Sequence, residues 1–198
     1  MGILILLRHG QSTWNLENRF TGSEDVDLTS LGIEEARNAS LFLKYYTIDF
    51  AFTSVLKRAV HTLEIILNKI GLNIPVFKSA ALNERDYGDM QGLNKAATIK
   101  KYGEAQVLDW RRSYQIAPPN GESLKDTYQR VIPYYIAEIE PKLKAGKTIL
   151  IVAHGNSLRA LVMYLEDISE KYIADFEIAT GVLRVYHFDE KLKITAIS

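Results

Sequence analysis

Ile3-Leu4-Ile5-Leu6-Leu7-Arg8-His9-Gly10 is an apolar run that ends in an arginine, a histidine and a glycine. Because its apolar residues do not alternate with polar ones, it predicts a central strand covered on both faces. A second run of the same kind, Ile149-Leu150-Ile151-Val152-Ala153-His154-Gly155, lies far along the chain. Parallel sheets bind ligands outside the carboxyl ends of their strands. We therefore expect both His-Gly ends to face one crevice.

The bulk composition is that of an ordinary globular chain. Its 198 residues suit one domain, residues 1–198, with a sizeable core. Lys and Arg together number 24, as do Asp and Glu, so the net charge of zero predicts neither a nucleic-acid nor a membrane partner. The chain has no cysteine, and the run at Ile3 is too short to span a bilayer and has no charged lead-in. We expect a cytoplasmic protein without disulfides.

Strand and helix patterns alternate along the rest of the chain. Helices are expected after Thr29, from Ser54 to Gly71, from Ser123 with a bend at Pro133, and from Ser157 to Leu165. Further strands are expected at residues 48–53, 75–77, 148–153, 183–188 and 194–197. The polar, glycine-rich stretch from Leu82 to Lys95 and the mixed helical stretch to Arg112 predict a lobe over the active site. This order predicts an α/β fold with three layers, α/β/α, and a mostly parallel central sheet.

The candidate site combines two histidines with Arg8 and Arg58. A zinc site needs three or four ligands, and the chain has no HExxH motif and no cysteine pair. Acyl transfer by serine is not supported either, because there is no GxSxG elbow. Arginine guanidinium groups match phosphate oxygens. Arginines beside histidines therefore indicate an oxyanion site, and no metal is expected.

A histidine held among arginines can itself attack phosphorus. Its cationic neighbours disfavour a second positive charge, so the ring keeps its lone pair. The leaving oxygen then needs a proton donor. Glu84 is the candidate, since a carboxyl group beside a phosphate dianion holds its proton to higher pH.

These residues carry a resemblance that spans most of the chain. Leu7-Arg8-His9-Gly10 followed by Gln11-Ser12-Thr13-Trp14-Asn15 resembles the signature of the histidine phosphatase superfamily and, within it, of the cofactor-dependent phosphoglycerate mutases. Further segments match in the family's order: residues 18–22, 53–59, 82–85, 87–88, 91–95, 110–112 and 153–159. A lone Arg-His-Gly would be weak evidence, whereas this ordered series is specific.

The resemblance implies a role for each matching residue. His9 would be the phosphorylated nucleophile and Glu84 the proton donor and acceptor, while Arg8, Arg58 and His154 would hold the transferring phosphoryl group. Asn15, Gly155 and Asn156 would donate hydrogen bonds to that group. The substrate's carboxylate and second phosphate would be bound by Ser12, Thr21, Gly22, Arg85, Tyr87, Lys95, Arg111 and Arg112.

The resemblance also implies a phosphoglycerate mutase-like fold and the interconversion of 3-phosphoglycerate and 2-phosphoglycerate, a step of glycolysis and gluconeogenesis. The small three-carbon acid would react without a metal, and 2,3-bisphosphoglycerate would be both primer and intermediate. A homodimer is expected from the resemblance alone.

Three departures from the family pattern bear on the activity. Asp86 stands where close relatives often have histidine, the stretch from Tyr114 to Ser123 is short, and the sequence stops at Ser198 without the tail of longer members. Such a tail is associated with closing the site against water, so its absence favours some hydrolysis. The alternative is a phosphomonoesterase of the same superfamily. The short turn of such phosphatases is similar to Pro118-Pro119-Asn120-Gly121-Glu122-Ser123 in this chain. A binding module without catalysis would be expected to lack His9 or Glu84.

Overall fold

The computed structural model describes residues 1–198 and is built on a six-stranded sheet of order β3-β2-β4-β1-β5-β6. β1 (Gly2–Arg8) pairs in parallel with β4 (Thr148–Ala153), which pairs in parallel with β2 (Phe50–Thr53), and β3 (Val76–Lys78) extends this parallel part. β5 (Leu183–Phe188) is antiparallel to β1, and β6 (Ile194–Ile197) is antiparallel to β5. The predicted strands all form, and the mostly parallel sheet is confirmed.

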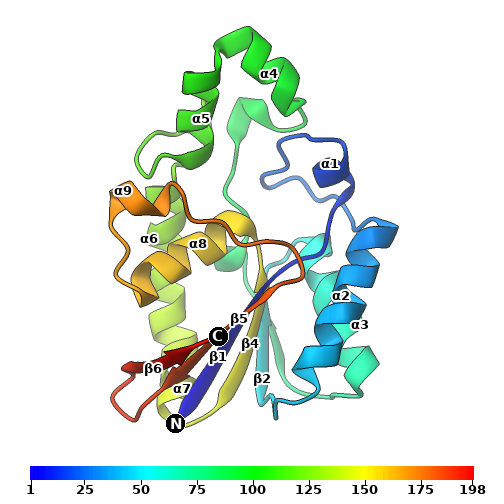
Figure 1. Ribbon diagram of the computed structural model, residues 1–198, viewed down its shortest axis with the longest axis vertical. Coiled ribbons are helices and arrows are strands. Elements are labelled where there is room, and N and C mark those ends of the chain that lie inside the picture. Colours follow the sequence, from blue (N-terminus) through cyan, green and yellow to red (C-terminus); the bar gives the residue numbers. More distant parts are fainter.

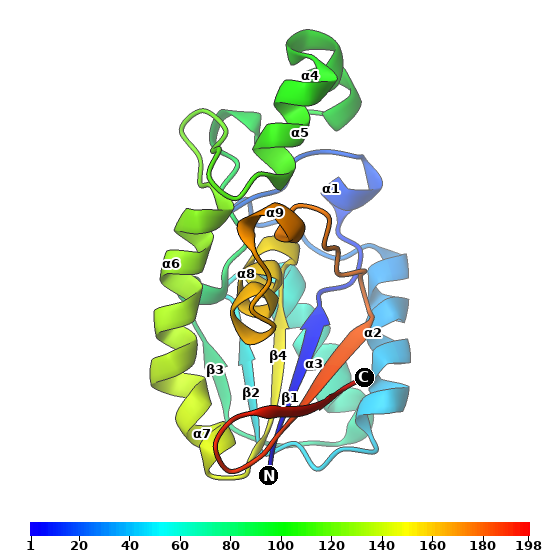
Figure 2. The same cartoon turned by 60° about the vertical axis from the view of Figure 1, so that its left-hand side comes forward.

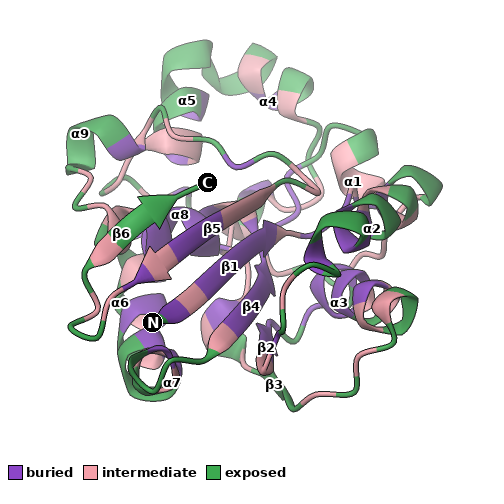
Figure 3. Cartoon of the chain, turned by 60° about the horizontal axis from the view of Figure 1, so that its bottom comes forward, coloured by how far each residue is buried: buried purple, intermediate pink, exposed green.

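Helices cover both faces of this sheet (Figure 1; Figure 2). Alternate residues of the central strands enter two separate cores, so Leu4 and Leu6 pack on one face while Ile5 and Leu7 pack on the other. The first face is covered by α6 (Leu124–Tyr134) and α8 (Gly155–Leu165), the second by α2 (Ser30–Leu43) and α3 (Lys57–Ile70). The predicted three-layer α/β/α arrangement is confirmed. Figure 3 shows β1 and β4 almost entirely buried between the layers.

The helix ends follow their predicted caps with one exception. The Thr29 hydroxyl accepts from the Gly32 amide, and the Ser123 hydroxyl from the Asp126 amide. Gly71 ends α3 in the left-handed conformation, with φ of 68°. The prediction that Ser54 caps α3 is wrong: the helix starts later, after Leu56, and no side chain caps it.

Pro133 is the last residue but one of α6, which continues into η3 (Tyr135–Ile139), a π-helical segment that leads into α7 (Glu140–Lys144). Proline has no amide to donate, so it interrupts the regular pattern of helical hydrogen bonds. The sequence predicts a bend at Pro133, and the structure places a helical irregularity two residues after it.

A lobe projects beyond the carboxyl ends of the parallel strands. It contains α1 (Thr13–Leu16), η2 (Gly88–Met90), α4 (Lys95–Tyr102) and α5 (Glu104–Arg112), and the short α9 (Glu170–Ile173) lies below α5 (Figure 1). The 3-10 turn η1 (Ala80–Leu82) contacts α6, and its Leu82 belongs to the main core. The lobe's own small core consists of Phe20, Met90, Val107 and Trp110. The single long helix pattern of the sequence is split at Gly103, whose φ is 85°. No helix has the length and apolar composition needed to cross a membrane.

Candidate active site

The two His-Gly ends lie side by side at the edge of the sheet. Arg8 of β1 is in register with Ala153 of β4, and the His9 amide donates to the Ala153 carbonyl at 3.0 Å. The His9 and His154 rings have centroids 5.0 Å apart, and both side chains are buried. Neighbouring parallel strands thus join two histidines far apart in the sequence, as predicted.

The next helix begins at once after His154. Helix α8 was expected from Ser157, but it begins at Gly155 with His154 as its N-cap, so Gly155 and Asn156 form its first turn rather than a loop. The Asn156 amide donates to Glu84 Oε1 at 3.0 Å. The free amides and the dipole at a helix start favour anions, so this geometry suits the carboxylate and an incoming phosphoryl group.

The environment of His9 keeps its ring neutral. Nδ1 lies 2.6 Å from the Gly10 carbonyl oxygen, which can only accept, so Nδ1 carries the proton and Nε2 has the free lone pair. Burial, and then the charges of Arg58 and Arg8, lower the pKa of His9 well below its usual value. The pKa of His154 is lowered by burial and by Arg58 in the same way. Both rings are therefore neutral near pH 7.

Arg58 and Arg8 are held by backbone carbonyls, and Arg8 keeps one buried donor without a partner. Arg58 donates to the Glu24 and Gly22 carbonyls at 2.8 Å, and burial lowers its pKa to about 10. Arg8 donates from Nη1 to the Ile178 carbonyl at 2.8 Å, while its buried Nε has no partner. Buried polar groups are normally hydrogen-bonded. An orphaned guanidinium donor beside a neutral histidine fits the binding of a phosphoryl oxygen.

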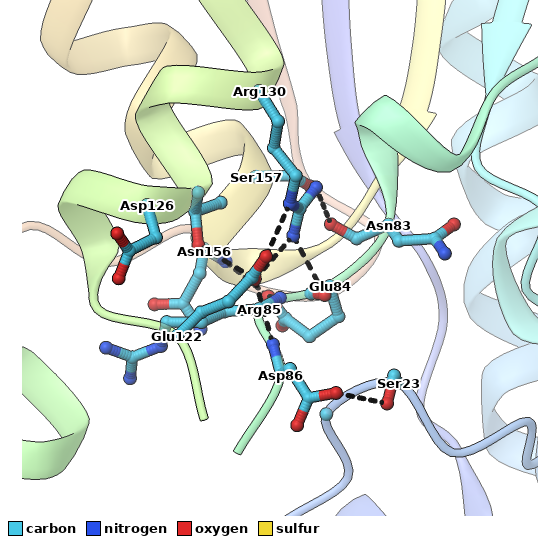
Figure 4. Close-up of polar contacts among 12 residues, drawn as sticks. Ser23, Asn83, Glu84, Arg85, Asp86, Glu122, Asp126, Arg130, Asn156 and Ser157 are labelled. Atoms are coloured by element: carbon cyan, nitrogen blue, oxygen red, sulfur yellow. Dashed lines mark hydrogen bonds and ion pairs between the residues drawn. The ribbon is translucent and has the colours of Figure 1, made fainter. Parts of the chain in front are cut away.

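Glu84 is fixed by its backbone as well as by its carboxylate (Figure 4). Arg130 of α6 donates to the carbonyls of Ala81, Asn83 and Glu84 at 2.8, 3.0 and 3.1 Å. The same guanidinium binds both Glu122 oxygens, at 3.0 and 2.9 Å. Glu84 Oε1 also accepts from the Arg85 amide at 2.8 Å. The loop that carries the candidate proton donor is thus tied to a helix at several points.

A cavity of about 140 Å³ opens over these groups. Most of the predicted residues line it: Arg8, Asn15, Thr21, Gly22, Glu84, Tyr87, Lys95, Arg111, Arg112, Gly155 and Asn156. His9, Arg58 and His154 are buried beneath this lining rather than part of it.

Two predicted substrate-binding residues do not reach the cavity. Ser12 is buried as the N-cap of α1 and holds Asn15 through mutual hydrogen bonds. Arg85 is also buried, and its Nη2 donates to the Tyr87 hydroxyl and the Arg111 carbonyl at 2.9 Å. In this conformation both support residues that do line the cavity.

The sequence interpretation missed other lining residues, namely Arg19, Phe20, Arg159, Glu177 and Ile178. Arg159 lies one helical turn after Asn156, and its Nη1 donates to Asn156 Oδ1 at 2.9 Å. Residues three apart on a helix lie on the same face, so the sequence could have indicated that Arg159 lies beside Asn156. Glu177 and Ile178 belong to no motif, because only the path of the chain between α9 and β5 brings them here.

The comparisons with known proteins agree with this geometry. The profile described as "Histidine phosphatase superfamily (branch 1)" matches residues 4–195. The chain belongs to the histidine phosphatase superfamily. A protein from Cytophaga hutchinsonii, named 2,3-bisphosphoglycerate-dependent phosphoglycerate mutase, is 59% identical over 198 residues, which cover 100% of this chain and 93% of that protein.

Solved structures of the superfamily share the fold. Bacillus stearothermophilus YhfR superposes with a TM-score of 0.86 at 26% identity, over 97% of this chain and 93% of that one. A mycobacterial glucosyl-3-phosphoglycerate phosphatase superposes with a TM-score of 0.84 at 27% identity, covering 98% and 95% of the two chains. The predicted membership of the histidine phosphatase superfamily and the likeness to its phosphoglycerate mutases are confirmed.

Proposed function

We propose that this protein interconverts 3-phosphoglycerate and 2-phosphoglycerate through a phosphorylated His9. The observation that carries the proposal is one cavity lined by Arg8 and Glu84 above His9 and also by Lys95, Arg111 and Arg112. The first group suits phosphoryl transfer, and the second suits an additional anionic group on the same ligand. The high identity to a protein named as such a mutase supports the same reaction.

The chain's own residues account for the transfer. His9 Nε2 forms the bond to phosphorus while the ester P–O bond breaks, and Glu84 gives its proton to the leaving oxygen. In the return step Glu84 takes the proton from the accepting hydroxyl as the P–N bond breaks. Arg8, Arg58 and the start of α8 offset the charge on the transferring group. His154, neutral beside His9, accommodates that group without adding a charge.

The remaining lining residues suit substrate orientation. Lys95, Arg111 and Arg112 would bind the carboxylate and the second phosphate of the substrate. Thr21, Gly22 and Tyr87 also line the cavity. 2,3-bisphosphoglycerate supplies the phosphoryl group that primes His9. The orphaned donor of Arg8 and the excess of cations in the lining fit such a highly charged molecule.

We also propose that residues 1–198 form a single catalytic domain, that the reaction needs no metal ion, and that the protein is a cytoplasmic homodimer. The first is supported by the cavity itself, which takes residues from both ends of the chain.

A phosphomonoesterase is the second candidate. It is favoured by the superposition with a protein named as a phosphatase, and its chemistry would use the same His9 and Glu84 with water as acceptor. The additional cations of the cavity favour the mutase, because hydrolysis of a monoester needs a single phosphate pocket.

The deciding experiment follows 3-phosphoglycerate in the presence of a chelator, with and without trace 2,3-bisphosphoglycerate, while free phosphate is measured in the same tube. Primer-dependent formation of 2-phosphoglycerate with little free phosphate is the expected result. Phosphate release without isomerisation would instead establish the phosphomonoesterase.

The nucleophile is tested separately with the His9→Ala variant. It should neither accept label from 2,3-bisphosphoglycerate nor turn over, because it lacks the imidazole whose Nε2 forms the bond to phosphorus. Labelling of this variant at another residue would refute the assignment.

A further inference from the structure

Glu177 forms an ion pair with Arg112 inside the candidate site. Both residues line the cavity, together with the cations Arg8, Arg19, Lys95, Arg111 and Arg159. The only other carboxylate in the lining is Glu84, whose Oε1 is bound by two backbone amides. Glu177 is thus the one lining carboxylate that pairs with a lining cation.

The backbone around Glu177 is fastened on both sides. Arg159 donates to the Ile173 carbonyl before it, and Arg8 donates to the Ile178 carbonyl directly after it. Further on, the Thr180 hydroxyl donates to Glu35 at 2.9 Å. These contacts keep residue 177 at the mouth of the cavity.

The side chain of Glu177 is free by comparison. Its exposed fraction is 67%, against 25% for Arg112. An ion pair this exposed to water is weak and easily exchanged for another anion. The Glu177 backbone therefore keeps the Glu177 carboxylate near Arg112, while the carboxylate itself can move away from Arg112 without disturbing the fold.

We propose that Glu177 is an internal competitor that occupies Arg112 until the carboxylate or second phosphate of the substrate displaces it. This rests on the function proposed above and adds a specificity residue to it. A ligand with a second anionic group must displace the Glu177 carboxylate, and that group then forms an ion pair with Arg112. A phosphate ester with a neutral tail leaves the ion pair intact.

The matched ligands for the test are 3-phosphoglycerate and glycerol 3-phosphate, which differ in having a carboxylate or a hydroxymethyl group at the same position. Their Kd values are measured by calorimetry for the wild-type protein, for Glu177→Gln and for Asp175→Asn. Asp175 lies two residues away, is exposed and takes part in none of the salt bridges, so it controls for the loss of one negative charge.

We expect Glu177→Gln to lower the Kd of 3-phosphoglycerate about two- to fivefold relative to the Kd of glycerol 3-phosphate. This range corresponds to the free energy of an exposed ion pair. Asp175→Asn should leave the ratio of the two Kd values unchanged. An unchanged ratio in Glu177→Gln, an equal shift in both variants, or weaker binding of 3-phosphoglycerate would overturn the proposal. Wild-type protein that binds glycerol 3-phosphate but not 3-phosphoglycerate would instead refute the proposed function.

Discussion

At the scale of single residues, the reaction depends on a histidine that stays neutral among cations. The pKa of His9 is lowered by burial, by Arg58 and by Arg8. Its lone pair is therefore available at a pH where an exposed histidine, with a pKa near 6.5, is protonated. Burial of the Arg58 guanidinium is unfavourable by itself, and hydrogen bonds to the Glu24 and Gly22 carbonyls stabilise it there.

The pH profile of kcat/KM reports the protonation of His9 in the free enzyme. In the wild-type protein the acid limb attributable to His9 should lie below pH 6.5. Arg58→Gln removes one of the charges that lower the pKa of His9, so the limb should move to higher pH. Loss of a phosphoryl-binding charge should also reduce the plateau about 10²- to 10³-fold.

Arg37→Gln is the matched control, because Arg37 forms an exposed pair with Glu34 on α2. It should leave both plateau and limb unchanged. An acid limb that stays in place in Arg58→Gln would show that Arg58 does not set the protonation of His9.

At the scale of elements, α6 holds the loop that carries Glu84. Arg130 donates to the carbonyls of Ala81, Asn83 and Glu84 and to the Glu122 carboxylate (Figure 4). Arg130→Met should reduce kcat about 100-fold, because misplacing a reacting group by an ångström has an effect of this size. Phosphate binding should change much less, since Arg8 and Arg58 do not contact Arg130.

The measurements are kcat and the inhibition constant of inorganic phosphate, with Arg130→Lys and Lys125→Met for comparison. Lys125 is an exposed residue of the same helix. Arg130→Lys should restore part of kcat, and Lys125→Met should behave as wild type. Equal losses of kcat and phosphate affinity in Arg130→Met would indicate general disruption instead of misplacement of Glu84.

The start of α8 supplies another prediction at this scale. A Cβ on Gly155 would lie 3.6 Å from both Arg8 Cζ and Glu84 Oε2, an ordinary contact that the folded protein tolerates. Gly155→Ala should keep the stability or raise it by up to about 1 kcal/mol, as glycine is a poor helix former. The same methyl group lies where a phosphoryl group approaches, so the affinity for inorganic phosphate should fall about tenfold.

Gly10→Ala provides the contrast. A Cβ there would lie 2.2 Å from the Gly32 carbonyl oxygen, a backbone atom that cannot move aside easily. This variant should lose stability in urea unfolding. Gly155→Ala with unchanged phosphate affinity would contradict the placement of the phosphoryl group over α8.

At the scale of the whole molecule, two neutral buried histidines make stability depend on pH. Below about pH 6.5 the unfolded chain binds protons at His9 and His154 that the folded protein does not, because both folded-state pKa values are lowered. The free energy of unfolding should therefore fall as the pH decreases from 6.5 toward 5. The expected slope is about 1.4 kcal/mol per pH unit for each histidine.

Urea unfolding at pH 7.5, 6.5 and 5.5 checks this slope. His154→Gln should show about half of the decrease, since one buried histidine remains. A free energy of unfolding that does not fall between pH 6.5 and 5.5 would contradict the lowered pKa values.

Local signals in the chain determined the layers and most of the candidate site. Unbroken apolar runs at residues 3–7 and 149–153 can be stable only between two helical layers, and each ends in its own His-Gly. Caps such as Thr29 and Gly71 act through neighbouring backbone groups, so their effect is readable from the sequence. The family signature added the roles of the scattered cations and agreed with Glu84 as the candidate proton donor.

Tertiary packing determined the features of the site that local sequence signals do not predict. The Ser54 hydroxyl lies 2.7 Å from His154 Nε2 and accepts from the Leu56 amide, so it does not cap α3. Arg85 and Ser12 are buried under the cavity because their neighbours bind them there. Glu177 reaches Arg112 only through the path of the chain after α9. The pairs Ser54–His154, Arg85–Arg111 and Arg112–Glu177 join residues distant in sequence, and the energies of such contacts depend on burial and distance, which exist only in the folded chain.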